Sequence, residues 1–121
     1  MRKRILIVDD EMDMLAIMKT SLEHINYDVS TFTNPLEALE HFKKDPNRFD
    51  LVITDLRMSE MQGDDFSDEL LRIKPEIPIF LFTGFSTIEL KEKANFLRIK
   101  EVIDKPFSLN YIINKIKEYL Y

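Results

Sequence analysis

The sequence predicts an α/β domain with a central parallel sheet. Short apolar runs alternate along the chain with longer segments whose apolar residues recur at helical spacing, which indicates alternating strands and helices. The short runs are almost continuously apolar, as in strands that helices cover on both faces. The central run is Leu51-Val52-Ile53-Thr54, which stops abruptly at the carboxylate of Asp55. We therefore expect Asp55 at the carboxyl end of a buried strand, where open α/β sheets bind their ligands.

Length and composition favour one globular domain over residues 1–121. Of the 121 residues, 45% are hydrophobic and 32% are charged, which suffices for a core without disulfides. The formal net charge of −5 argues against direct nucleic-acid binding, which usually requires a basic face. Cysteine is absent, and His24 and His41 are the only histidines, so thiolate and His-rich zinc sites are excluded.

The sequence contains no segment that would place the chain in or across a membrane. The apolar run after Met1-Arg2-Lys3-Arg4 ends at Asp9 and is too short for the core of a signal peptide. No stretch approaches the roughly 20 apolar residues of a transmembrane helix. We expect a cytoplasmic protein without a membrane partner.

The first two strand–helix pairs precede residue 45. A strand over 5–8 leads to a helix whose apolar face comprises Leu15, Met18, Leu22 and Ile25. A second strand is expected over 28–32. The next helix begins at Asn34-Pro35-Leu36-Glu37, where Asn caps the helix, Pro takes the first position and Glu can reach back to the cap.

The remaining elements follow the central strand. Asp64 or Asp65 is expected to cap a helix that carries Phe66, Leu70 and Ile73. A fourth strand covers 79–82, and Ser86 with Glu89 has the spacing of a capping box, which predicts a helix from Ser86 to about 96. A short strand over 101–103 precedes a last helix that Ser108 caps, with apolar residues Leu109, Ile112, Ile113, Ile116 and Leu120.

Five successive β-α pairs and right-handed crossovers leave few possible topologies. The common one at this length is the flavodoxin-like (βα)5 fold, a doubly wound five-stranded parallel sheet in the order 2-1-3-4-5. In that order the carboxyl ends of four neighbouring strands carry Asp9-Asp10, Asp55, Thr83-Gly84 and Lys105-Pro106. These residues should converge in one crevice.

The converging side chains favour phosphoryl transfer with a divalent cation. Two carboxylates about 5 Å apart repel by roughly 3 kcal/mol at an effective dielectric near 20, so three of them require a proton or a cation. An all-oxygen site suits Mg²⁺. Lys105 and Thr83 would hold phosphoryl oxygens, and Asp55 would be the nucleophile that forms an acyl phosphate. Any one of these residues alone would more simply be a helix cap or a loop residue, and the inference depends on their joint placement.

Together the motifs resemble the receiver domain of response regulators in two-component signal transduction. They are Ile5-Leu6-Ile7-Val8-Asp9-Asp10-Glu11, Asp55-Leu56-Arg57-Met58 with Gly63 downstream, Thr83-Gly84, and Lys105-Pro106-Phe107. The resemblance implies that Asp55 accepts a phosphoryl group from the phosphohistidine of a sensor histidine kinase or a phosphotransfer protein. It also implies slow autodephosphorylation and signalling through altered contacts with an output protein or domain, by a monomer or weak dimer.

The resemblance further assigns the site residues. It implies Mg²⁺ bound by Asp10, Asp55 and the backbone carbonyl of Arg57, with Asp9 acting largely through water. Thr83 and Lys105 would contact the phosphoryl oxygens.

Three positions depart from the family pattern. Ser59 replaces a usual Pro, and Arg98 stands where Gly is frequent, which predicts an irregular end to the preceding helix. Val102 occupies the position, three residues before Lys105, of the aromatic that moves on activation in the family.

Two other functions were weighed. A Mg²⁺-dependent phosphatase with an aspartyl-phosphate intermediate usually needs a second Asp two residues after the nucleophile, where this chain has Arg57. A flavin-binding module would need a phosphate-cradling loop, which a chain with two glycines does not provide. The sequence favours a phosphorylation switch.

Overall fold

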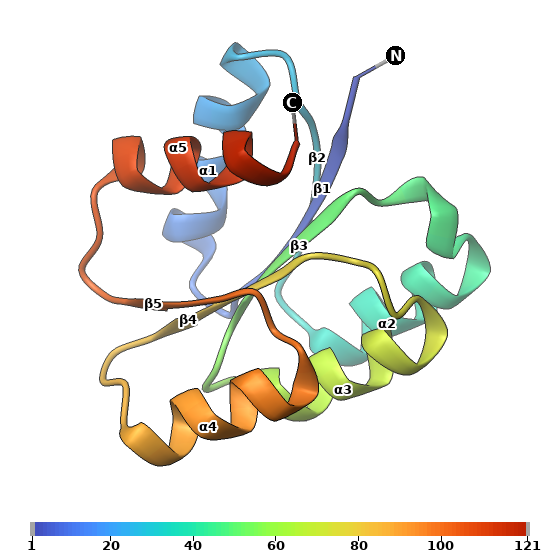
Figure 1. The fold of residues 1–121 in the computed structure, drawn as a ribbon. Coiled ribbons are helices and arrows are strands. Elements are labelled where there is room, and N and C mark those ends of the chain that lie inside the picture. Colours follow the sequence, from blue (N-terminus) through green and yellow to red (C-terminus); the bar gives the residue numbers. More distant parts are fainter. Residues whose placement is uncertain (1, 121) are drawn as a thin grey trace.

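The computed structural model describes residues 2–120 and contains one parallel sheet (Figure 1). Its strand order is β2-β1-β3-β4-β5, which confirms the predicted topology. The strands are β1 (Arg4–Val8), β2 (Asp28–Phe32), β3 (Leu51–Asp55), β4 (Ile79–Thr83) and β5 (Glu101–Asp104). The strands differ from those predicted by at most one residue at either end.

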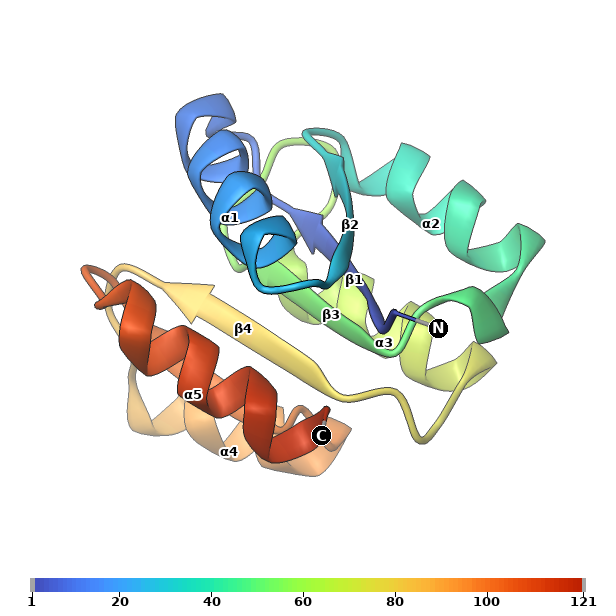
Figure 2. The ribbon, with the colours of Figure 1, turned by 90° about the horizontal axis from the view of Figure 1, so that it is seen from above.

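The helices cover both faces of the sheet. They are α1 (Met12–His24), α2 (Pro35–Lys44), α3 (Gly63–Ile73), α4 (Ile88–Leu97) and α5 (Leu109–Tyr119), with a short 3₁₀ helix, η1 (Pro46–Arg48), before β3. Helices α1 and α5 lie on one face, and α2, α3 and α4 lie on the other (Figure 1). In the view from above, α5 lies in front of α4 (Figure 2). Among residues 2–120, no helix is long and apolar enough to cross a membrane.

Each strand divides its side chains between two hydrophobic cores, because successive residues of a strand point to opposite faces. In β1, Ile5 and Ile7 join the core under α1 and α5, whereas Leu6 and Val8 join the core under the other helices. All four side chains are almost completely buried. This two-sided burial explains why the strand sequences are almost continuously apolar.

Two of the predicted helix caps are confirmed. Asn34 accepts a hydrogen bond from the Leu36 amide at 2.9 Å, with Pro35 in the first turn of α2. Ser108 accepts one from the Tyr111 amide at 3.0 Å at the start of α5. Both caps join residues at most three positions apart in sequence, so they can be predicted without a structure.

Two other predicted starts are wrong. Helix α3 begins at Gly63 and not after Asp64 or Asp65, because the Gly63 amide donates to the Leu56 carbonyl at 2.7 Å and turns the chain there. Helix α4 is capped by Thr87, which accepts from the Leu90 amide at 3.0 Å, and not by Ser86. The Ser86 hydroxyl instead bonds to Asp104, at a distance in sequence that no local pattern reveals.

The end of α4 is a left-handed cap rather than an irregular unwinding. Arg98 has φ 71° and ψ 27°, and its amide donates to the Asn95 carbonyl. Glycine adopts this conformation without strain, but a residue with a Cβ does not. The Arg at this position therefore gives a regular cap that costs conformational energy.

Candidate functional site

The carboxylates of Asp9, Asp10 and Asp55 converge at the carboxyl edge of the sheet. Strands β1 and β3 are neighbours in parallel register, so the residues that follow them lie side by side. One carboxylate oxygen from each of the three residues lies within 4.8 Å of the others. Asp9 is buried, Asp10 is exposed and Asp55 is intermediate. The predicted acidic cluster is therefore present and open to solvent on the side of Asp10.

Lys105, the residue directly after β5, completes this cluster. Its Nζ lies 3.2 Å from Asp55 Oδ1 and 3.4 Å from Asp9 Oδ2. The Lys105 amide donates to the Thr83 carbonyl at 2.7 Å, which holds the start of the loop between β5 and α5 against the end of β4. The side chain thus bridges the two more buried carboxylates and leaves the exposed Asp10 on the solvent side.

The electrostatics of the cluster act mainly on Asp55. Burial raises the pKa of Asp55, and the nearby negative charge of Asp9 raises it further, while Lys105 partly offsets both effects. Burial lowers the pKa of Lys105, but the charges of Asp9 and Asp55 outweigh this, so the pKa of the ammonium is raised. The ionised form of Asp55 is consequently destabilised by its surroundings, and a bound cation would counter this effect.

The donor set fits a divalent cation. Three carboxylates and one ammonium leave a formal charge of −2 within a few ångströms. All candidate ligands are oxygens, and the exposed Asp10 leaves room for water, which Mg²⁺ retains when it binds to proteins. The residues present therefore suit Mg²⁺ in both charge and ligand type.

Backbone contacts hold the two more buried carboxylates in place. Asp9 Oδ1 accepts from the Glu11 amide at 2.9 Å, and Asp55 Oδ1 accepts from the Leu56 amide at 3.1 Å. Gly63 packs directly on the Asp55 backbone, and a Cβ at this position would clash with the Asp55 carbonyl oxygen. Sequence reasoning took Gly63 only as part of a motif and missed this packing role.

Gly84, by contrast, is not required by packing within the chain. A Cβ at Gly84 would meet no protein atom within 4 Å, and its φ is not positive. The space beside it is open, so the absence of a side chain at Gly84 leaves that space free of protein atoms.

The Thr83 hydroxyl is engaged within its own loop. Thr83 is buried, and its Oγ1 accepts from the Phe85 amide and donates to the Phe85 carbonyl, both at 3.2 Å. The side chain of Phe85 itself is 79% exposed. Thr83 is thus at the predicted strand end, but its hydroxyl bonds to Phe85 instead of to the acidic cluster.

Arg57 and Val102 are the two further positions that depart from a related pattern. Arg57 is exposed on the loop after β3. Val102 is half-buried on β5 and packs against the core under α2, α3 and α4.

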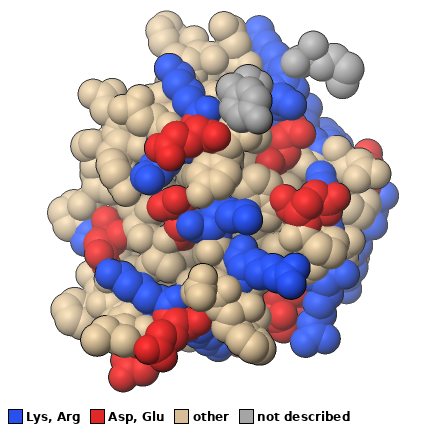
Figure 3. Space-filling view, viewed as in Figure 1, with Lys and Arg blue, Asp and Glu red and all other residues tan. Residues whose placement is uncertain are grey.

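Cations and carboxylates alternate at the edge of the sheet opposite the acidic cluster. Arg2, Lys3, Arg4 and Arg48 lie there beside Asp28, Asp45 and Asp50, and Arg2 and Arg4 form ion pairs with Asp28. Figure 3 shows Lys and Arg side chains gathered along the edge of the molecule where Figure 1 places the N-terminus. The acidic cluster is therefore a local feature of the carboxyl edge and not the result of a uniformly acidic surface.

The family model described as "Response regulator receiver domain" matches residues 5–117. The chain belongs to the response regulator receiver family. It is a receiver domain of the kind found in two-component systems.

Curated relatives of this receiver fall into two groups by length. It is 34% identical over 118 residues to the response regulator receiver protein CpdR of Brucella abortus (strain 2308), covering 98% of this chain and 97% of CpdR. It is 37% identical over 121 residues to the nisin biosynthesis regulatory protein NisR of Lactococcus lactis subsp. lactis, covering 94% of this chain. The match covers only 48% of NisR, and only 26% of the transcriptional regulatory protein ZraR of Klebsiella oxytoca.

Solved receiver structures agree with this fold. A receiver domain protein from Methanospirillum hungatei JF-1 superposes with a TM-score of 0.90 at 28% identity, over 98% of this chain and 93% of that one. The response regulator TrrA from Thermotoga maritima, in complex with Mg(2+)-BeF, superposes with a TM-score of 0.85 at 30% identity, over 98% of this chain and 99% of that one.

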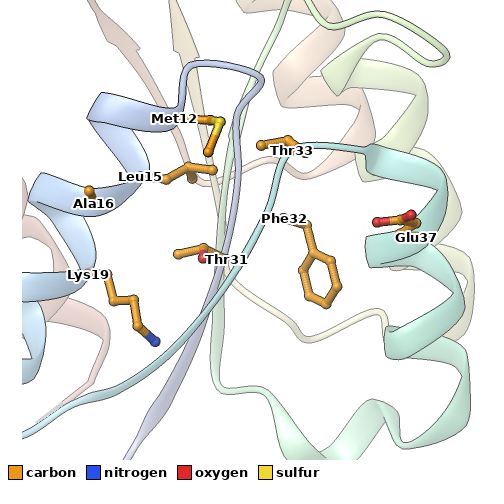
Figure 4. A pocket seen from close by; sticks show the side chains of 8 residues that line it. All are labelled: Met12, Leu15, Ala16, Lys19, Thr31, Phe32, Thr33 and Glu37. Atoms are coloured by element: carbon orange, nitrogen blue, oxygen red, sulfur yellow. The ribbon is translucent and has the colours of Figure 1, made fainter.

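A groove of the receiver borders the segment that carries Asp9 and Asp10, because it includes Met12 and also Phe32, whose carbonyl accepts from the Asp9 amide at 3.1 Å. It runs between α1 and the segment from β2 to α2 (Figure 4), and it is lined by Met12, Leu15, Ala16, Lys19, Thr31, Phe32, Thr33 and Glu37. The Nζ of Lys19 donates to the Val29 carbonyl at 3.0 Å on the edge strand β2. None of the predicted site residues lines this groove, so it plays no part in the chemistry considered below.

Proposed function

We propose that this receiver accepts a phosphoryl group on Asp55 from the phosphohistidine of a sensor histidine kinase or a phosphotransfer protein. The observation that carries the proposal is the convergence of three carboxylates with the Lys105 ammonium at the carboxyl edge of the sheet. An Asp55 carboxylate oxygen forms a bond to phosphorus while the bond between phosphorus and the histidine nitrogen breaks. The products are an acyl phosphate on Asp55 and a free imidazole on the donor.

The acidic cluster would hold Mg²⁺ during this reaction. Asp10, Asp55 and the Arg57 backbone carbonyl are the proposed direct ligands, and Asp9 is proposed to act through water. When bound, Mg²⁺ supplies positive charge against the phosphoryl oxygens. Asp9 also orients Lys105, to which it lies 3.4 Å away, and its own position is fixed by the Glu11 amide.

Lys105 and Thr83 are proposed to bind the transferred group. Lys105 Nζ is already 3.2 Å from Asp55 Oδ1, so its charge is available where negative charge accumulates. The Thr83 hydroxyl would reach the phosphoryl group after leaving its two bonds to Phe85. Lys105 therefore already lies beside Asp55, whereas Thr83 would reach the phosphoryl group only after a movement of the loop between β4 and α4.

The proposed output is a change of protein contacts around this loop. Phe85 and Ile88 follow Thr83 by two and five residues and are 79% and 75% exposed, so movement of this loop would displace apolar surface. Val102 is small and has a single stiff rotatable bond, so it would not swing between exposed and buried positions as an aromatic ring does. We therefore propose that the output protein or domain contacts residues 85–89 more than the surface at Val102.

Several further properties belong to the same proposal. Residues 1–121 form one receiver domain, cytoplasmic and monomeric or weakly dimeric, without direct contact to nucleic acid or membrane. It catalyses only its own phosphorylation and slow autodephosphorylation, and it is not an enzyme that acts on other molecules. Arg57 and Phe85 stand where faster family members tend to have groups that orient water, which supports a long-lived acyl phosphate.

Incubation with Mg²⁺ and acetyl phosphate distinguishes this function from a phosphatase. The expected result is one acid-labile phosphoryl group per chain by intact mass. After the donor is removed, the label should decay slowly and release no more than one phosphate per labelled chain. Continuous donor hydrolysis without an accumulating label would instead support the phosphatase. Absence of both would contradict the proposed function.

A further inference from the structure

We propose that Asp104 is a positioning residue that holds the loop after Thr83 in its resting conformation and so sets how readily the site responds to a phosphoryl group. The inference rests on the proposed function of the site. It concerns the residue directly before Lys105, which neither contacts Asp55 nor belongs to the proposed metal ligands. Its partner is Ser86, which stands directly before the Thr87 cap of α4.

Two hydrogen bonds join Asp104 to Ser86. The Ser86 amide donates to Asp104 Oδ1 at 2.9 Å, and the Ser86 hydroxyl donates to Asp104 Oδ2 at 3.1 Å. Both carboxylate oxygens thus bind one residue of the loop, and charge-assisted bonds of this kind are stronger than neutral ones. Because Asp104 pairs with Thr83 in the parallel register of β4 and β5, this contact spans the loop from one strand end to the other.

The contact holds the loop between β4 and α4, and this loop must move for the Thr83 hydroxyl to reach a phosphoryl group on Asp55. Between the paired strand end and Ser86 lie only Gly84 and Phe85, and Phe85 holds the Thr83 hydroxyl through its amide and its carbonyl. For the hydroxyl to turn toward a phosphoryl group on Asp55, both bonds to Phe85 must break. A fixed Ser86 restricts the backbone movement that would release them.

The contact therefore stabilises the resting arrangement over the responding one. A pair of hydrogen bonds present in only one of two conformations biases the equilibrium toward that conformation. Removing the pair should shift the equilibrium by about fivefold, which appears as an equal change in the apparent affinity for a phosphoryl analogue. The site would then respond at lower analogue concentration although no residue that touches the analogue has changed.

Three substitutions separate the contact from the charge of Asp104. Asp104→Ala removes both the contact and a negative charge near the site. Asp104→Asn removes the charge but keeps a carbonyl oxygen for the Ser86 amide and an amide group for the Ser86 hydroxyl. Ser86→Ala removes one of the two bonds and leaves every charge in place.

The test is a beryllofluoride titration at saturating Mg²⁺, followed by the backbone NMR signals of Gly84 and Phe85. We expect half-saturation about fivefold lower in Asp104→Ala, a smaller decrease in Ser86→Ala, and a value close to wild type in Asp104→Asn. The double variant Ser86→Ala with Asp104→Ala should match Asp104→Ala alone, because both changes act on one contact. Resting spectra of each variant report whether it is folded, and Ser86→Ala tests the inference by itself should Asp104→Ala fail to fold.

The outcomes separate the two proposals. Equal decreases in Asp104→Ala and Asp104→Asn would show a charge effect and overturn the inference, as would an unchanged or weakened response in Asp104→Ala and Ser86→Ala. A wild-type protein that shows no saturable response to beryllofluoride and Mg²⁺ would overturn the proposed function of the site, and the inference with it.

Discussion

Replacing Asp55 by Asn should stabilise the protein when divalent metal is absent. The change is isosteric, and it removes the charge of Asp55 from the acidic cluster. Carboxylate oxygens of Asp9 and Asp10 lie within 4.8 Å of an oxygen of Asp55. Each of these repulsions amounts to about 3.5 kcal/mol at an effective dielectric near 20.

The substitution also removes an attraction. Lys105 Nζ lies 3.2 Å from Asp55 Oδ1, which corresponds to about 5 kcal/mol at the same dielectric. The two repulsions together exceed this attraction by about 2 kcal/mol, and screening at the exposed Asp10 reduces the difference. We expect Asp55→Asn to raise the free energy of unfolding by about 1–2 kcal/mol, or the melting temperature by roughly 4–8 °C.

The effect should depend on pH. The pKa of Asp55 in the folded protein is raised above its ordinary value, so the folded state favours the protonated carboxyl. The resulting stability is fully present below the unfolded pKa and is lost as the pH rises through the folded pKa. The advantage of Asp55→Asn over wild type should therefore be largest near pH 7 and shrink as the pH falls toward 4.

Thermal melts of both proteins in EDTA, from pH 7.5 down to pH 4, measure this difference. Glu40→Gln is the matched control, because Glu40 is exposed on α2 and its replacement changes the net charge equally. The control should melt close to wild type. An Asp55→Asn protein that is no more stable than wild type at pH 7.5 would refute the electrostatic account of the site.

Three further predictions concern the metal, the end of α4 and the lifetime of the label. Mg²⁺ should raise the melting temperature of wild type, and Asp10→Ala should remove most of this rise because it deletes a proposed ligand; a wild-type melting temperature independent of Mg²⁺ would contradict the metal site. Arg98→Gly should stabilise the protein by about 0.5–1 kcal/mol in urea unfolding, because glycine relieves the left-handed cap at φ 71°; no gain would mean that the Arg98 side chain compensates for the strain. Phe85→Glu and Arg57→Asn should speed decay of the acyl phosphate by offering groups that orient water, and unchanged decay in both would reject a shielding role.

The sheet and the acidic cluster could be predicted because the first follows from the hydrophobic pattern of the strands and the second follows from the strand order. Continuously apolar strands indicate two-sided burial, and alternating strands and helices with right-handed crossovers fix the strand order. Once the order 2-1-3-4-5 is assumed, Asp9, Asp10, Asp55 and Lys105 must meet at one edge. The separations within this cluster agree with that inference.

The loop between β4 and α4 could not be predicted in the same way. Ser86 and Glu89 have the spacing of a capping box, yet Ser86 bonds to Asp104, which lies 18 residues later in the sequence. The direction of the Thr83 hydroxyl likewise depends on the loop backbone and not on residue type. The packing of Gly63 on the Asp55 backbone could have been predicted, since a glycine in the loop after a functional strand often marks a close approach of two backbone segments.

The most direct test of the account is the position of the phosphoryl group. The protein is incubated with Mg²⁺ and acetyl phosphate, reduced with borohydride, which converts an aspartyl phosphate to homoserine, and mapped by peptide mass spectrometry. Homoserine should appear at position 55 in wild type and in Asp104→Asn, and Asp55→Asn should carry no label. Homoserine at Asp9, Asp10 or elsewhere, or a phosphoryl group retained by Asp55→Asn, would contradict the assignment of Asp55 as the acceptor.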